Sequence, residues 1–291
     1  MFSRPTRTTR TTRTTFQRAA FRTLRAVTLL AAMGASAAHA DTTLDRIHQR
    51  HKIVIGVILS GPPFGSLDPA TQKPLGFNID LANDVAKRLG VDVELTPVQP
   101  SNRVQFLQQG KVDALIANME VTKERAELFS YPPTPFEEIG GALITRKDSG
   151  IKTWNDVRGK PVCVSQGSNY TKPLAEEYGA QVKAFRGQPE SLLALRGNNC
   201  VAAVHVAPTL RLLVARNPDW KDYTIPVSNE LIPSPSVIWV RKGETDTQSA
   251  LEKIVQDWHR SGWLIDVEKK NGMQPSQAVL DLHAKYKAQG A

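Results

Sequence analysis

Cysteine is scarce in this sequence, and the residue patterns that hold metals and cofactors are missing. The 291 residues include two cysteines, Cys163 and Cys200, and no Cys-x-x-Cys motif. The six histidines show no paired ligand spacing, which argues against a zinc site. No Ser/His/Asp constellation stands out, and Gly140-Gly141 lies in no phosphate-binding context. We therefore expect neither a metal nor a cofactor.

The first forty residues contain no aspartate or glutamate. Seven arginines there precede an apolar run over residues 26–33, and Ala38-His39-Ala40 follows it. This order is typical of a secretory signal peptide, so we expect cleavage after Ala40 and a soluble periplasmic protein. The run is too short for a membrane anchor, and no cysteine lies nearby for lipidation. An organelle transit peptide remains the alternative, because such peptides are also rich in arginine and poor in acids.

Removing residues 1–40 changes the charge of the chain. Lysine plus arginine falls from 37 to 30 while all 28 acidic residues remain, so the formal charge drops from +9 to +2. Most of the basic character therefore belongs to the leader, and we expect no nucleic-acid partner. The remaining 251 residues are enough for two lobes with separate cores.

Beyond residue 40, buried-strand patterns alternate with amphipathic-helix patterns, which predicts an α/β fold with parallel sheets and right-handed crossovers. The strand patterns cover residues 52–58, 91–98, 112–117, 140–145, 162–165, 181–185, 201–206 and 236–241. The helix patterns cover residues 44–51, 79–89, 102–110, 122–128, 172–178, 189–196, 251–258, 263–270 and 279–286.

The stretch from residue 102 to residue 132 has the strongest functional signal. A buried strand over 112–117 passes through a polar loop into a helix with Arg125 in its first turn. Ligands of open α/β sheets bind at the carboxyl ends of strands, and an arginine there can hold a carboxylate with two parallel hydrogen bonds. The alternative is a solvated Arg125 paired with Glu124 or Glu127.

An ordered set of motifs connects this stretch to the rest of the chain. In sequence order they are Pro62-Pro63-Phe64, Gly76-Phe77 with Asp80-Leu81-Ala82, Gly110-Lys111-Val112-Asp113, Thr122-Lys123-Glu124-Arg125, Phe129-Ser130, Gly159-Lys160-Pro161-Val162 and Ser165-Gln166-Gly167-Ser168. Over roughly residues 50 to 272, the sequence resembles the extracytoplasmic solute-binding proteins of the polar amino acid type, which are receptors of ABC importers.

The resemblance implies a two-lobe fold of the periplasmic-binding-protein-like type II class. Each lobe would be a parallel-rich sheet with flanking helices, and two hinge crossings would join the lobes. Residues 41–139 would form lobe one and residues 140–240 lobe two, with hinge strands at the ends of lobe two. The helices of residues 241–291 would return to lobe one.

The resemblance also implies a ligand site between the lobes. Arg125 would hold the ligand's α-carboxylate, and Phe64 would form a wall, with a core position as its alternative. The other expected ligand-binding residues are Asn118, Glu120, Gly167, Ser168, Asn169, Tyr170 and His205. Glu120 could instead face solvent, and His205 could be a hydrogen-bonded core residue.

This sequence departs from the family pattern where the ligand's ammonium would bind. The family usually places an aspartate near the end of the third strand of lobe two, but positions 205–207 are His205, Val206 and Ala207. A buried ammonium without a counter-charge is costly. Either the solute lacks an α-amine, or another acid such as Glu120 replaces the aspartate.

The two cysteines lie at the first and third strands of the second α/β series. With strand order 2-1-3 these strands are neighbours, so a disulfide between Cys163 and Cys200 is expected in an exported protein. Two buried free thiols are the alternative.

The favoured function is a periplasmic receptor that captures a small carboxylated solute, as a monomer, and delivers it to ABC permease subunits in the inner membrane. A periplasmic dehydratase- or lyase-like enzyme on the same scaffold is the alternative, with Glu120 as general acid or base. A third possibility, the sensor domain of a kinase, would need fused signalling domains, which the sequence up to residue 291 does not contain.

Overall fold

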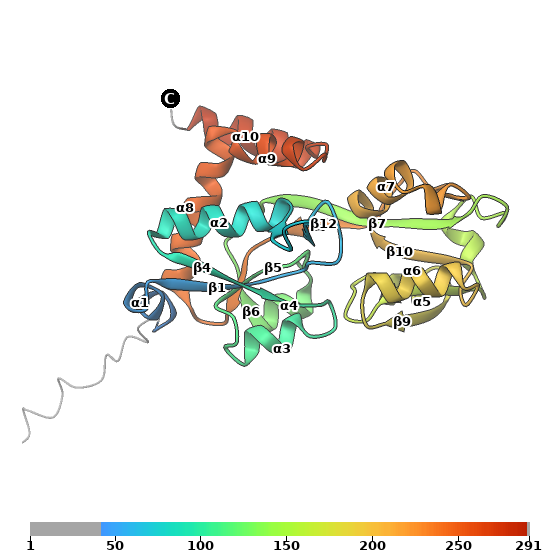
Figure 1. Ribbon diagram of the computed structural model, residues 1–291, viewed down its shortest axis with the longest axis horizontal. Helices are drawn as coiled ribbons and strands as arrows, with labels where there is room; N and C mark the ends of the chain where they lie inside the picture. Colours follow the sequence, from blue (N-terminus) through green and yellow to red (C-terminus); the bar gives the residue numbers. More distant parts are fainter. Residues whose placement is uncertain (1–41, 290–291) are drawn as a thin grey trace, which may run out of the picture. The chain divides into compact units, whose positions relative to one another are not determined.

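The computed structural model describes residues 42–289, in which two large mixed β-sheets are each flanked by helices (Figure 1). We call the sheet with the first strand, together with its helices, lobe one, and the other sheet with its helices lobe two. The predicted α/β architecture of two lobes is confirmed. The predicted signal peptide and its cleavage site lie outside the described residues.

The lobe-one sheet has strand order β4-β1-β5-β13-β6. Strand β1 pairs in parallel with β4 and with β5, and β13 runs antiparallel between β5 and β6. These strands are, in chain order, β1 (Lys52–Val57), β4 (Asp92–Pro97), β5 (Ala114–Ile116), β6 (Phe129–Ser130) and β13 (Trp239–Arg241). A hairpin of β2 (Ser66–Leu67) and β3 (Pro74–Leu75) lies in a stretch for which no strand pattern was predicted.

Helices cover both faces of the lobe-one sheet because its strand side chains alternate in direction. Ile53, Ile55 and Val57 pack in one core cluster with α2 and the C-terminal helices, whereas Val54 packs in the cluster of the opposite face, which includes α3. The helices of this lobe are α1 (Thr42–Gln49), α2 (Phe77–Leu89), α3 (Arg103–Gln108), α4 (Lys123–Leu128), α8 (Thr245–Ser261), α9 (Trp263–Lys270) and α10 (Gln277–Ala288).

The lobe-two sheet has strand order β11-β7-β10-β8-β9, and β12 also pairs with β7. Strands β8, β9 and β10 are parallel in the predicted order 2-1-3, and β7 is antiparallel to β10. The strands are β7 (Glu137–Arg146), β8 (Pro161–Ser165), β9 (Gln181–Phe185), β10 (Ala202–Val206), β11 (Tyr223–Thr224) and β12 (Leu231–Ser236).

Two core clusters, one on each face of this sheet, hold its helices. Helix α5 (Thr171–Glu176) packs on one face, and α6 (Gln188–Arg196) and α7 (Ala207–Arg216) pack on the other. Short 3-10 helices η1 (Trp154–Val157) and η2 (Pro218–Trp220) complete the lobe. Helix α7, which the sequence analysis did not identify, begins directly after β10 with Pro208 in its first turn.

Two segments connect the lobes, as predicted. Strand β7 leaves lobe one, and β12 runs antiparallel beside it on the return path (Figure 1). The return segment was predicted as one strand over residues 236–241, but it is divided. Strand β12 ends at Ser236 in the lobe-two sheet, buried Val237 and Ile238 follow, and β13 then joins the lobe-one sheet.

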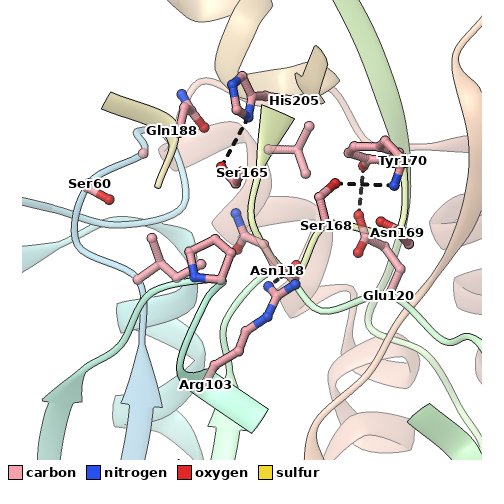
Figure 2. A pocket seen from close by; sticks show the side chains of 14 residues that line it. Ser60, Arg103, Asn118, Glu120, Ser165, Ser168, Asn169, Tyr170, Gln188 and His205 are labelled. Atoms are coloured by element: carbon pink, nitrogen blue, oxygen red, sulfur yellow. Dashed lines mark hydrogen bonds between the residues drawn. The ribbon is translucent and has the colours of Figure 1, made fainter. Parts of the chain in front are cut away.

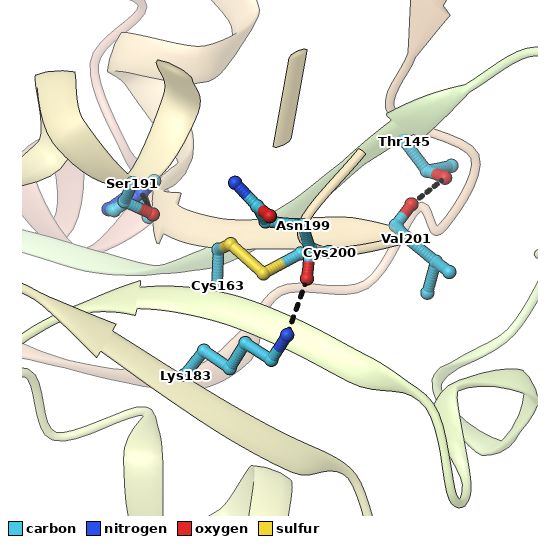
Figure 3. The surroundings of a disulfide bond; sticks show 8 residues. Thr145, Cys163, Lys183, Ser191, Asn199, Cys200 and Val201 are labelled. Atoms are coloured by element: carbon cyan, nitrogen blue, oxygen red, sulfur yellow. Dashed lines mark hydrogen bonds between the residues drawn. A yellow bond between two sulfur atoms is a disulfide. The ribbon is translucent and has the colours of Figure 1, made fainter. Parts of the chain in front are cut away.

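Cys163 and Cys200 form the predicted disulfide (Figure 3). Cys163 lies in β8 opposite Ala203 of β10, and Cys200 lies two residues before the start of β10, which brings the two Cα atoms to 5.8 Å. Beside the disulfide, the Lys183 ammonium donates a hydrogen bond to the Asn199 carbonyl at 2.8 Å. The free-thiol alternative is therefore wrong.

Candidate ligand-binding site

A cavity of about 50 Å³ lies between the lobes (Figure 2). Lobe one supplies Ile58, Ser60, Gly61, Pro100, Arg103, Asn118 and Glu120 to its wall, and lobe two supplies Ser165, Ser168, Asn169, Tyr170, Gln188, His205 and Val206. Most of these side chains are polar, in contrast to the apolar clusters behind the strands.

The topology explains why these residues meet. Asn118 and Glu120 follow β5, the Ser168–Tyr170 turn follows β8, and His205 and Val206 end β10. The carboxyl ends of parallel strands in each lobe therefore face the same space, as expected for ligand sites in open α/β sheets. Six predicted site residues line the cavity: Asn118, Glu120, Ser168, Asn169, Tyr170 and His205.

Arg103 is the cationic side chain in the cavity wall, and the sequence analysis missed it. It begins α3, is 3% exposed, and its Nη1 donates hydrogen bonds of 2.6 Å to the carbonyls of Ala117 and Asn118. Its Nε has no hydrogen-bond partner among the described residues. Burial, and then repulsion from Arg125, lower the pKa of Arg103 to about 9. An anion next to this guanidinium would therefore be strongly favoured.

Arg125 is held behind the cavity wall and is not one of the lining residues. Thr122 caps α4 by accepting a hydrogen bond from the Arg125 amide at 3.2 Å. The guanidinium donates to the Glu120 carbonyl at 2.7 Å, to the Glu120 carboxylate at 3.4 Å and to the Gly167 carbonyl of lobe two at 3.1 Å. The alternative of a solvated Arg125 is wrong, because this side chain is buried against Glu120. Its contact with a ligand carboxylate stays a prediction.

Glu120 connects the two lobes. Its carboxylate accepts a hydrogen bond of 2.7 Å from the Tyr170 hydroxyl, and its backbone forms a β-bridge with Ser236. Only 2% of Glu120 is exposed, so the alternative of a solvent-facing Glu120 is wrong. Burial and the negative charge of Glu120 raise the pKa of Tyr170 well above its ordinary value, which keeps the phenol protonated as a donor.

The turn after β8 brings the backbone of lobe two against lobe one. Gly167 has a φ of +80°, and a Cβ atom there would lie 2.4 Å from the carbonyl oxygen of Pro100, so only glycine fits. Gly167 itself does not line the cavity, but its carbonyl binds Arg125. Next in the turn, Asn169 has a buried Nδ2 without a partner among the described residues.

His205 lines the cavity as a neutral side chain. Its Nε2 lies 2.9 Å from the Ser191 hydroxyl and its Nδ1 lies 3.5 Å from the Ser165 hydroxyl. Burial lowers the pKa of His205 to about 3, so the ring carries no charge near neutral pH. Val206 also lines the cavity, and the end of β10 therefore contributes no carboxylate to it.

Phe64 is a core residue, so its predicted place in the ligand wall is wrong. The side chain is 1% exposed and packs edge-to-face on Phe77, with ring centroids 6.2 Å apart. It belongs to the lobe-one core cluster, while Gly61 of the same loop reaches the cavity. Apolar burial of the ring explains this position better than ligand stacking.

Residues 42–289 contain no cluster of three or more histidine, cysteine, aspartate or glutamate side chains that could hold a metal ion. None of the helices in the same range combines the length and the apolar character needed to cross a bilayer.

Comparisons with known proteins agree with this architecture. The model of the family described as bacterial extracellular solute-binding proteins, family 3, matches residues 53–274. The L-cystine-binding protein TcyJ of Escherichia coli (strain K12) is 27% identical over 257 residues, which cover 87% of this chain and 94% of TcyJ. The ABC transporter glutamine-binding protein GlnH of Bacillus subtilis (strain 168) is 27% identical over 259 residues, which cover 85% of this chain and 93% of GlnH.

Among solved structures, an ancestral arginine-binding protein bound to arginine is similar at a TM-score of 0.70 and 32% identity. The match covers 77% of this chain and 99% of that protein. The family match spans most of the chain and includes both lobes. This chain therefore belongs to the bacterial extracellular solute-binding proteins of family 3.

Proposed function

We propose that this protein captures a small carboxylated solute, an amino acid or a related compound, between its lobes and delivers it to an ABC permease in the inner membrane. The observation that supports this most directly is the set of polar groups that both lobes direct into one cavity. Two of its buried donors, Arg103 Nε and Asn169 Nδ2, have no partner among the described residues. Unpaired buried donors are costly, and carboxylate oxygens would satisfy them.

The charges around the cavity favour an acidic solute. Arg103 and Arg125 are cationic, Glu120 is anionic, and His205 is neutral because its pKa is lowered to about 3. These groups sum to one positive charge. A solute with one net negative charge, such as a dicarboxylic amino acid, would neutralise it, whereas a cationic amino acid would add to it.

Capture would involve a hinge between the lobes. A cavity of about 50 Å³ has room for only a few water molecules, so an amino acid needs the lobes to move apart to enter. The paired segments β7 and β12 are where such a motion would be absorbed. A solute that contacts both lobes favours the closed state through its differential affinity for the two states.

The enzyme alternative has less support. Glu120, the residue that it would need as general acid or base, is engaged by Arg125 and Tyr170. The named relatives TcyJ and GlnH are binding proteins. We further propose a monomer that reaches the periplasm after cleavage behind Ala40.

Thermal-shift screening of the mature protein against the twenty standard amino acids, L-cystine and simple dicarboxylates tests the function. Isothermal titration calorimetry would then give the affinity of each compound that raises the melting temperature. We expect an acidic amino acid to bind most tightly and an amino acid with a cationic side chain to bind weakly. A screen in which no amino acid or dicarboxylate binds would contradict the proposal.

A further inference from the structure

A groove of about 770 Å³ lies beside the ligand cavity, and we call it the α6/α7 groove because these two helices supply most of its wall. Ser60 of lobe one and Gln188 of lobe two line both the cavity and the groove. Figure 2 shows these two side chains on the side of the cavity away from Glu120 and Tyr170. The cavity and the groove are therefore neighbouring spaces that can hold two parts of one molecule.

Gly61 leaves the junction of the two spaces without a side chain. It lines the cavity, and a Cβ atom there would lie 3.6 Å from Oε1 of Gln188 and 3.9 Å from Oγ1 of Thr209, a residue of the groove wall. Gly61 does not have a positive φ, so its backbone conformation does not require glycine. A large side chain at position 61 would fill the space beside Gln188 and Thr209.

Thr209 contributes a buried hydroxyl to the groove wall. The residue is 2% exposed, and its Oγ1 has no hydrogen-bond partner among residues 42–289. A buried polar group without a partner is costly, and an amide of a bound compound would supply one. The position of this hydroxyl near Gly61 places the amide close to the cavity.

The rest of the groove suits an apolar group. Its wall contains two arginines, Arg196 and Arg216, and no acidic side chain, so a cationic group would be repelled. Small-molecule sites usually measure about 300–1,000 Å³ and are mostly apolar with a few polar groups, as this groove is and the cavity of about 50 Å³ is not. The apolar part of the wall consists mainly of Leu192, Leu193, Leu212, Leu213 and Trp220.

We propose that the solute extends from the cavity into the α6/α7 groove. Its carboxylated head lies in the cavity, and an apolar group, attached through an amide, passes Gly61 and lies between α6 and α7. The solute class is then an acylated or peptide-like derivative of an amino acid, and a free acidic amino acid fills only the cavity and binds more weakly. This inference rests on the proposed function, because the head group is the solute described there.

Calorimetry with L-glutamate and two extended compounds tests the inference. In γ-L-glutamyl-L-leucine the apolar group is attached to the side chain of glutamate, and in N-hexanoyl-L-glutamate it is attached to the amine. The pair therefore covers both directions in which the solute could extend. We expect one of the two to bind the wild type at least about tenfold more tightly than L-glutamate, as burial of about two methylene groups predicts.

Variants of the groove should remove this gain. Leu193 is 69% exposed, so Leu193→Glu should fold, and its charge in the apolar wall should weaken binding of the tighter extended compound at least about tenfold. Thr209→Val removes the unpaired hydroxyl at nearly constant volume and should weaken it by about two- to tenfold. Both variants should leave the affinity for L-glutamate unchanged. Leu280→Glu is the matched control, because Leu280 is an exposed leucine on α10 outside the groove.

Gly61→Leu gives a second readout, because it should fill the junction and lower the affinity for the extended compound relative to that for L-glutamate. Extended compounds that bind no more tightly than L-glutamate would overturn the inference and leave the proposed function standing. The same holds for a gain that persists in both Leu193→Glu and Gly61→Leu. A wild type that binds none of the three compounds would contradict the acidic solute of the proposed function as well.

Sedimentation of the mature protein tests a different occupant of the groove. We expect the wild type and Leu193→Glu to sediment alike. A wild-type dimer that Leu193→Glu converts to a monomer would assign the groove to a second copy of the chain and overturn the inference.

Discussion

Replacement of Arg103 should separate its part in binding from its part in folding. Arg103→Lys keeps a positive charge at the start of α3 but loses the planar guanidinium, whose Nε has no partner among residues 42–289. We expect this variant to fold and to bind both L-glutamate and glutarate at least about tenfold more weakly, because Arg103 serves carboxylates that both compounds carry.

Arg103→Met should in addition destabilise the protein. The guanidinium donates two hydrogen bonds of 2.6 Å, to the carbonyls of Ala117 and Asn118. Leaving a buried acceptor unpaired costs about 1–3 kcal/mol, so the free energy of unfolding should fall by about 2–6 kcal/mol. Without these two hydrogen bonds the loop after β5 would be held less firmly, so Asn118 and Glu120 would no longer keep their positions in the cavity wall.

Urea unfolding followed by tryptophan fluorescence measures the stability change, and calorimetry measures the affinities. Arg158→Lys and Arg158→Met are matched controls, because Arg158 is exposed and donates one hydrogen bond of 3.3 Å to the Glu177 carbonyl. Both controls should leave binding unchanged and lower stability by less than ~1 kcal/mol. Wild-type affinity of Arg103→Lys for both compounds would refute the assignment of Arg103 to the solute carboxylates.

Three further predictions concern the scaffold. Replacing both Cys163 and Cys200 by serine should lower the free energy of unfolding by about 2–4 kcal/mol, because the disulfide closes a loop with a sequence separation of 37; equal unfolding midpoints of the two proteins would contradict this. Burial raises the pKa of Glu268 to about 7, above its unfolded value, so its contribution to stability is lost as pH rises from 4.5 through 7. In urea titrations, the wild type should lose up to ~3 kcal/mol of unfolding free energy between pH 5 and pH 8, and Glu268→Gln should not show this loss. Identical pH profiles of the two proteins would contradict this. N-terminal sequencing of the exported protein should begin at Asp41, and a sequence that retains the arginines would contradict the cleavage prediction.

The elements that periodicity and strand order determine could be predicted from the sequence. The 2-1-3 order of β8, β9 and β10 placed Cys163 beside Cys200, and the disulfide is present. Helix α7 was missed because it follows β10 without a loop, so no turn residues separate the two patterns. The division of the return segment into β12 and β13 was missed because residues 237–240 form one continuous apolar run.

The site was predictable where the family resemblance assigns residues next to a strand end, as for Asn118, Glu120 and Ser168, which line the cavity. Arg103 was missed because it lies eleven residues before the start of β5 and reaches the cavity only through the packing of α3. A polar residue at the start of a helix usually faces solvent, so the sequence contains no local signal for it. The pairing of Glu120 with Tyr170 depends on how the two lobes meet, which no local pattern specifies.

The close approach of Gly167 to the Pro100 carbonyl has a consequence for how such a receptor can diversify. At this point main-chain atoms of the two lobes lie against each other, so a side chain at position 167 would hold the lobes further apart. We expect this backbone contact to help set how far the lobes close. Substitutions of cavity residues would then change which solute binds, while the shape of the closed protein stays the same. We expect a membrane partner to meet one constant shape, whatever compound the cavity has come to accept.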